Sequence, residues 1–254
     1  MTKKILIVGG LGYLGSVITH KLLLEARYDL YVLESLTKLE SSKELISSLS
    51  EKVNILYQKD ERFFNFLGDK QSEVQLGVVD TVIFAVRNKK SKEVPNPLKS
   101  SLNPGNLLDQ IDNVILNQLK ILSLLGFDQQ TQSDRKIIQL FSSNANFISH
   151  QPIEYHALNA LTENIFTYLA VDLQKHSVRV FLIEIGVILN EISYPNNELV
   201  DSSPDELAEL IKFLINSEGY GLVGKPLKLT GIRNLLDATS VAEGVFGDLR
   251  VRKT

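Results

Sequence analysis

Short apolar runs alternate with stretches of helical spacing along most of the chain. Apolar residues in the second kind of stretch recur every three or four positions, as on one face of a helix. Strands that alternate with helices predict a parallel sheet with helices on both faces. The runs predicted to be strands are residues 4–8, 30–33, 53–57, 78–86, 136–141, 178–185 and 226–230.

Helical spacing begins directly after the first strand, with Leu14, Val17, Ile18, Leu22 and Leu24 as the apolar face. A later helix is predicted to start at Pro204, with Ser203 or Ser202 as its cap. We find no internal repeat, and we therefore expect one doubly wound Rossmann-type α/β domain, residues 1–254, with about seven parallel strands. The other predicted helices are residues 35–50, 63–75, 107–125 and 157–175.

Composition narrows the classes of partner. The 254-residue chain is 44% hydrophobic and has a net charge of −3, which gives no reason to expect nucleic acid or an anionic membrane as a partner. No apolar stretch has the length of a transmembrane helix, and the first run is too short and glycine-rich for a signal peptide. We therefore expect a cytoplasmic protein.

Cysteine is absent, which excludes disulfides, thiolate nucleophiles and Cys-ligated metals. The four histidines are scattered and show no paired metal-ligand spacing. We expect no metal.

The strongest local pattern is a glycine turn between the first strand and the first helix. Gly9, Gly12 and Gly15 are spaced every third residue, with Tyr13 and Leu14 between the last two. Strand, glycine turn and helix in this order are typical of a dinucleotide-binding βαβ unit, in which the amides of the helix N-terminus face the pyrophosphate. A tight strand-to-helix turn without a ligand is the alternative.

Glu34 stands at the end of the second predicted strand, about twenty positions beyond the glycine turn. A carboxylate there is placed to accept hydrogen bonds from the adenosine ribose and would repel a 2′-phosphate. We therefore expect NAD(H) rather than NADP(H). An ordinary solvated loop glutamate is the alternative.

These features resemble the short-chain dehydrogenase/reductase family over nearly the whole chain. The glycine turn has the spelling common in the family's nucleotide-sugar branch. The strand end at residues 141–143 resembles the one that carries the family's catalytic serine, and Tyr155 lies twelve residues beyond Ser143.

The resemblance implies a role for each matching position. Asp60 is similar to the acidic residue that contacts adenine, and Ala85 stands in the place of the family's Asn-Asn-Ala-Gly turn. Asn117 resembles the asparagine that holds a proton-relay water. Val187 belongs to a segment similar to the turn that touches nicotinamide, although Ile185 replaces its proline.

The chemistry that the resemblance implies is hydride transfer between the dinucleotide and a small or sugar-like hydroxyl or carbonyl substrate. Tyr155 would exchange the proton and Ser143 would hold the substrate oxygen. The family's lysine, four residues after the tyrosine, is replaced by Asn159. Asparagine can hydrogen-bond a ribose hydroxyl but carries no charge to make a phenol a better base. His156 is expected to be a surface or interface residue, with a substitute role for the lysine as the alternative.

Two functional classes stay open. The first is an NAD(P)-dependent oxidoreductase, and the second is a non-catalytic relative that keeps the dinucleotide pocket for a structural, sensing or partner role. The family resemblance also implies a homodimer or homotetramer, formed through the helices at 107–125 and 157–175.

Overall fold

A computed structural model describes residues 2–35, 42–49, 53–58, 78–86, 107–109, 111–129, 134–142, 153–185, 203–217 and 224–228. The predicted helix at 63–75 lies outside these ranges. Within them, the strands form one sheet of seven, and every neighbouring pair is parallel. The α/β fold class predicted from the sequence is confirmed.

The order in which the strands are added to the sheet reverses at its centre. Its order is β3-β2-β1-β4-β5-β6-β7, so the chain builds outward to one side of β1 and then returns to build the other side from β4. Ligands of open α/β sheets bind where the order reverses, outside the carboxyl ends of the strands. The strands are β1 Lys3–Val8, β2 Tyr28–Ser35, β3 Val53–Gln58, β4 Thr81–Phe84, β5 Arg135–Ser142, β6 Val178–Ile185 and β7 Pro226–Lys228.

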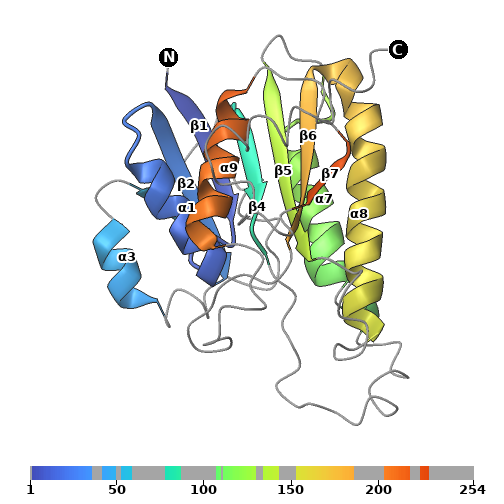
Figure 1. Ribbon diagram of the computed structural model, residues 1–254, viewed down its shortest axis with the longest axis horizontal. Helices are drawn as coiled ribbons and strands as arrows, with labels where there is room; N and C mark the ends of the chain where they lie inside the picture. The colour runs from blue at the N-terminus through green and yellow to red at the C-terminus, as the bar shows by residue number, and fades with distance from the viewer. Residues whose placement is uncertain are drawn as a thin grey trace.

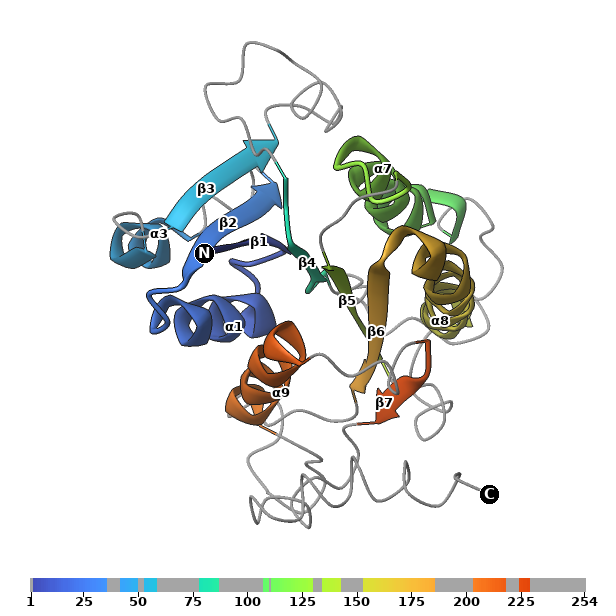
Figure 2. The same cartoon turned by 90° about the horizontal axis from the view of Figure 1, so that it is seen from above.

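Helices cover both faces of the sheet, as Figures 1 and 2 show. On one face, α1 (Tyr13–Leu23) packs beside α9 (Pro204–Asn216), and two ion pairs join them, Lys21 to Glu209 and Lys212 to Glu25 on the turn after α1. On the other face lie α7 (Asn117–Leu124) and α8 (Ile153–Leu173). The short helix α3 (Lys43–Leu49) lies near the β3 edge.

The core is divided by the sheet into two layers. One layer joins the α1 and α9 residues Ile18, Leu22, Leu207 and Ile211 to one set of strand side chains. The other joins Ile121, Leu122 and Phe166 to the alternate set. This alternation explains why the central strands read as continuous apolar runs, because both of their faces are buried.

Three helix predictions need correction or refinement. Leu24 was expected on the apolar face of α1, but its side chain is 81% exposed because the helix ends at Leu23. Helix α8 begins at Ile153 rather than 157. In the predicted 107–125 helix, residues Ile111–Leu116 form a π-helix before α7.

The start of α9 agrees with the sequence. Ser203 is the cap, its hydroxyl accepts from the amide of Glu206, and the Glu206 carboxylate accepts from the amide of Ser203. This reciprocal pair satisfies two amides at the helix start.

Two buried cationic side chains, Arg135 and Lys136, stabilise the end of the sheet where the strands begin. Arg135 is 1% exposed, donates hydrogen bonds to the carbonyls of Val79, Leu125 and Gly126, and lies 3.6 Å from the centre of the Phe127 ring. Burial lowers the pKa of its guanidinium from the ordinary value. Arg135 thus ties the start of β4 and the end of α7 to β5.

The next residue, Lys136, is 3% exposed and donates from Nζ to the carbonyls of Leu214, Ile215 and Ser217. These carbonyls lie at the C-terminus of α9, where a helix has unpaired acceptors and a partial negative charge. Lys136, at the start of β5, therefore caps the C-terminus of α9.

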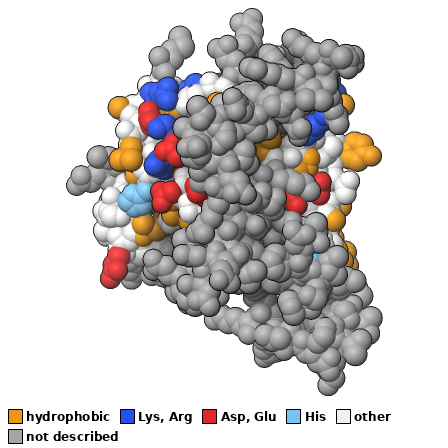
Figure 3. Space-filling model, viewed as in Figure 1, with side chains coloured by type: hydrophobic (Ala, Val, Ile, Leu, Met, Phe, Trp, Pro, Cys, Tyr) orange, Lys and Arg blue, Asp and Glu red, His pale blue; other side chains and the backbone are white. Residues whose placement is uncertain are grey.

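On the face of the molecule drawn in Figure 3, acidic and basic side chains are interspersed among the described residues.

Candidate functional site

The glycine turn lies at the carboxyl edge of the sheet, at the point where the strand order reverses. Gly9 has φ +83°, a left-handed conformation that favours glycine. Its amide donates to the carbonyl of Leu33 at the end of β2, and a Cβ on Gly9 would stand 3.1 Å from the carbonyl carbon and oxygen of Ala85. The turn is therefore enclosed between the ends of β2 and β4, and Ala85 directly borders it.

Helix α1 begins close against this turn. Gly12 is the N-cap, and its amide donates to Gly9 O at 3.0 Å. A Cβ on Gly15 would overlap Gly9 O and stand 2.8 Å from Gly10 Cα. Only a glycine at position 15 lets the helix start so near the turn.

The first turn of α1 has no side-chain cap hydrogen bond and no acidic residue. Tyr13 is half exposed and Leu14 half-buried, and both belong to this first turn. The positive end of the helix dipole is thus unopposed by protein carboxylates within the helix. Such an end suits a phosphate.

Glu34 is half-buried beside the turn, and its Oε1 accepts a hydrogen bond from the amide of Leu11 at 2.8 Å. The side chain therefore turns toward the glycine turn rather than out into solvent, which removes the interpretation as a solvated loop residue. Leu11 is a residue that the sequence reasoning missed, because it takes part through its backbone amide and no side-chain pattern marks such a contact.

The predicted reaction centre lies on the α7 and α8 side of the same edge. Asn117 is half-buried and opens α7 directly after the π-helix Ile111–Leu116. Single π-helical turns recur at functional sites because they re-aim side chains within a helix.

Tyr155 is half-buried in the first turn of α8. One turn further on, Asn159 is 5% exposed, and both ends of its side-chain amide are engaged. Oδ1 accepts from the amide of Ser142 at 3.0 Å, and Nδ2 donates to the carbonyl of Tyr155 at 2.8 Å. The structure thus brings Tyr155, Asn159 and the end of β5 together.

Comparison with solved structures identifies the architecture. A short-chain dehydrogenase from Bacillus anthracis superposes with a TM-score of 0.69 at 19% identity, over 92% of this chain and 98% of that one. The fold is that of a short-chain dehydrogenase.

Two further structures of this fold are informative. An oxidoreductase from Haemophilus influenza with bound NAD has a TM-score of 0.69 at 18% identity, covering 91% of this chain and 94% of that one. A short-chain oxidoreductase from Pseudomonas aeruginosa PAO1 with an atypical catalytic centre has a TM-score of 0.68 at 15% identity, covering 90% and 96%. Other structures of the same fold hold NADPH. No protein-family model matches the chain, and no curated protein matches it in sequence.

Three predicted site residues of this short-chain dehydrogenase fold lie outside the described residues: Ser143, Asp60 and Val187. Ser142, the neighbour of Ser143, is the last residue of β5 and is half-buried. Its backbone amide takes part in the site by donating to Asn159, as the Leu11 amide does by donating to Glu34. The only sequence signal for this position is the Ser142–Ser143 doublet.

His156, expected at the surface or in an interface, lies beside Tyr155 at the start of α8. It is half-buried, both of its ring nitrogens are buried without a hydrogen-bond partner, and its ring lies edge-on to the Tyr155 ring at 5.9 Å between centroids.

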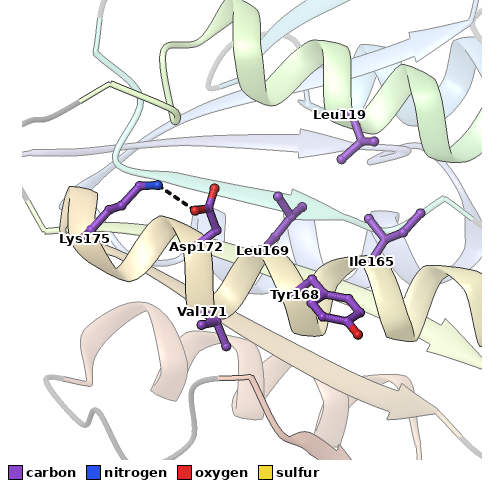
Figure 4. A pocket seen from close by; sticks show the side chains of 7 residues that line it. All are labelled: Leu119, Ile165, Tyr168, Leu169, Val171, Asp172 and Lys175. Carbon is purple, nitrogen blue, oxygen red and sulfur yellow. Dashed lines mark hydrogen bonds and ion pairs between the residues drawn. The ribbon is translucent and has the colours of Figure 1, made fainter.

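A groove of about 510 Å³ lies between α7 and α8, shown in Figure 4. None of the predicted site residues lines it. The walls are mainly apolar, and the Lys175–Asp172 ion pair, 2.6 Å long, closes one end. The lining residues are Leu119, Ile165, Tyr168, Leu169, Val171, Asp172 and Lys175.

Among the described residues, no group of three or more acidic or histidine side chains is arranged to hold a metal ion. No helix in the described ranges is long and apolar enough to cross a membrane.

Proposed function

We propose that this chain is a short-chain dehydrogenase/reductase that binds NAD(H) and acts as an oxidoreductase on a small or sugar-like hydroxyl or carbonyl substrate, with residues 1–254 as one domain. The observation that carries the proposal is the glycine turn, enclosed between Leu33 and Ala85 at the reversal of strand order. Glu34 lies on the same turn.

The residues present fit a dinucleotide. Gly9, Gly12 and Gly15 let the turn and the start of α1 pack closely, which presents the N-terminus of α1 at the carboxyl ends of the strands. Tyr13, Leu14 and Ala85 are proposed to border the bound dinucleotide. Glu34 is proposed to bind the ribose hydroxyls and thereby to favour NAD(H) over NADP(H). Asp60 is proposed to contact adenine, and Val187 nicotinamide.

When bound, the dinucleotide would supply or accept the hydride. The chain's own contribution is proton exchange and positioning. Tyr155 is proposed to give its hydroxyl proton to a substrate carbonyl oxygen, or to take a proton from an alcohol in the reverse direction. Ser143 would hold that oxygen and Asn117 a relay water.

A second candidate is a non-catalytic dinucleotide-binding protein. Asn159 favours it, because this side chain brings no charge and its amide is already bonded to Ser142 and Tyr155. A tyrosine without a cationic neighbour is a weak base at neutral pH.

Titration of NADH and NADPH, followed by a substrate panel on wild type, Tyr155→Phe and Asn159→Lys, separates the two. We expect submillimolar NADH binding in all three and hydride transfer that Tyr155→Phe removes. Hydride transfer gained only by Asn159→Lys, on an inert wild type, would establish the non-catalytic role. Absence of dinucleotide binding would exclude both candidates.

We further propose that the protein forms a homodimer or homotetramer through the α7 and α8 surface. Tyr168 and Val171 are 76% and 73% exposed beside the groove of Figure 4. Large apolar side chains gathered on one surface are typical of protein interfaces.

A further inference from the structure

Asn159 joins two elements whose backbones carry the proposed reaction centre. Its two hydrogen bonds, to Ser142 N and Tyr155 O, are here called the Asn159 bridge. The first bond spans 17 positions and links the end of β5 to α8, whereas the second stays within the helix. Asn159 is 5% exposed, and both of its hydrogen bonds are partly buried.

Strand β5 extends beyond its neighbour β4 at this edge. The last residue of β5 that pairs with β4 is Gln139, opposite Phe84, and Ser142 lies three positions further on. The strand end therefore lacks β4 alongside it. The Asn159 side chain supplies an acceptor there.

At position 159, one short side chain both accepts from Ser142 N and donates to Tyr155 O. Asparagine provides both, since its amide has a carbonyl oxygen and an NH₂ group. Lysine has donors only and cannot accept from the Ser142 amide. The replacement of the family's lysine therefore has a positive structural role in this chain.

We propose that Asn159 is a positioning residue that fixes the serine-bearing end of β5 against the first turn of α8, and not a ligand of the dinucleotide or a carrier of the proton. This inference rests on the proposed function for its meaning at the site. It predicts that the Asn159 bridge holds Ser142, at the end of β5, against the first turn of α8 before any ligand binds.

The direct test is the hydrogen-exchange rate of the Ser142 amide, measured by NMR on the full chain. Loss of one buried hydrogen bond corresponds to roughly a tenfold change in the opening equilibrium. We expect Asn159→Leu and Asn159→Ala to exchange Ser142 about tenfold faster. Asn159→Asp keeps an acceptor and should retain the Ser142 protection while losing the donor to Tyr155.

Asn164→Leu is the matched control. Asn164 lies on the same helix and makes the same kind of bond to the carbonyl four residues earlier, Nδ2 to Ala160 O at 2.8 Å, but is exposed. It should leave Ser142 exchange unchanged. The NADH dissociation constant should change less than threefold in Asn159→Ala, while any kcat falls more than tenfold with KM little changed.

Unchanged Ser142 exchange in both Asn159→Leu and Asn159→Ala would overturn the inference. So would NADH affinity weakened more than tenfold by Asn159→Ala, since this would make Asn159 a dinucleotide ligand. If wild type binds no dinucleotide, the proposed function fails, and the exchange comparison still decides whether the bridge exists.

Discussion

The carboxylate of Glu34 and the backbone amide of Leu11 form a hydrogen bond 2.8 Å long across the glycine turn. The bond joins the end of β2 to the loop that leads into α1. A carboxylate held in this way has its position fixed before a ligand arrives, and pre-organisation of this kind reduces the cost of binding. One residue thus both shapes the turn and presents negative charge beside it.

Replacing Glu34 by Ala should weaken NADH binding by roughly 10- to 100-fold, because hydrogen bonds to a charged group contribute about 1.5–3 kcal/mol. Calorimetric titration with NADH and NADPH measures the change. Glu34→Gln removes the charge but keeps the size of the side chain, and its amide oxygen can still accept the hydrogen bond from the Leu11 amide. We expect Glu34→Gln to narrow the preference for NADH over NADPH, and wild type that binds NADPH more tightly contradicts the assignment.

Gly15→Ala should abolish tight dinucleotide binding. The added Cβ overlaps Gly9 O, so α1 must move away from the turn, at about 1–3 kcal/mol for overpacking. Thermal unfolding and NADH titration measure the two effects. The control is Gly126→Ala, which introduces strain at φ +67° in the connection after α7. It should lower stability but keep NADH affinity, and equal loss of affinity in both variants would show a global cause.

Tyr168→Glu should dissociate the proposed oligomer to monomer, because it places a charge in an apolar interface. Sedimentation velocity measures the mass. Leu24→Glu is the control, since Leu24 is 81% exposed after the end of α1, outside the α7 and α8 surface. Monomeric wild type at micromolar concentration would contradict the proposal.

Lys136→Met should lower the free energy of unfolding by about 1–3 kcal/mol, because the carbonyls at the end of α9 lose a buried donor. Urea denaturation measures it. Lys3 Nζ also donates to Ile215 O, at 3.0 Å and from a half-buried position, so Lys3→Met should cost less. A greater loss of stability in Lys3→Met than in Lys136→Met would show that Lys3, and not Lys136, is the main cap of α9.

The sequence predicted the strands, the glycine turn and the place of Glu34, because each depends on neighbouring residues or on a fixed spacing along the chain. The short β4 and the early start of α8 depend on which backbone groups find partners, and apolar periodicity does not report this. The role of Asn159 was beyond the sequence for the same reason. Its partner is the amide of Ser142, 17 positions away, and an amide is present at nearly every residue.

The contacts that stabilise the fold and the residues of the candidate site lie at opposite ends of the parallel strands. Arg135 and Lys136 fasten the edge where strands begin, while the glycine turn, Glu34 and the Asn159 bridge occupy the edge where strands end. Substitutions where the strands begin should therefore lower mainly stability, and substitutions where the strands end should change mainly ligand binding. Substitutions at the carboxyl ends of the parallel strands can therefore change ligand specificity while the contacts that stabilise the amino ends of the strands stay intact.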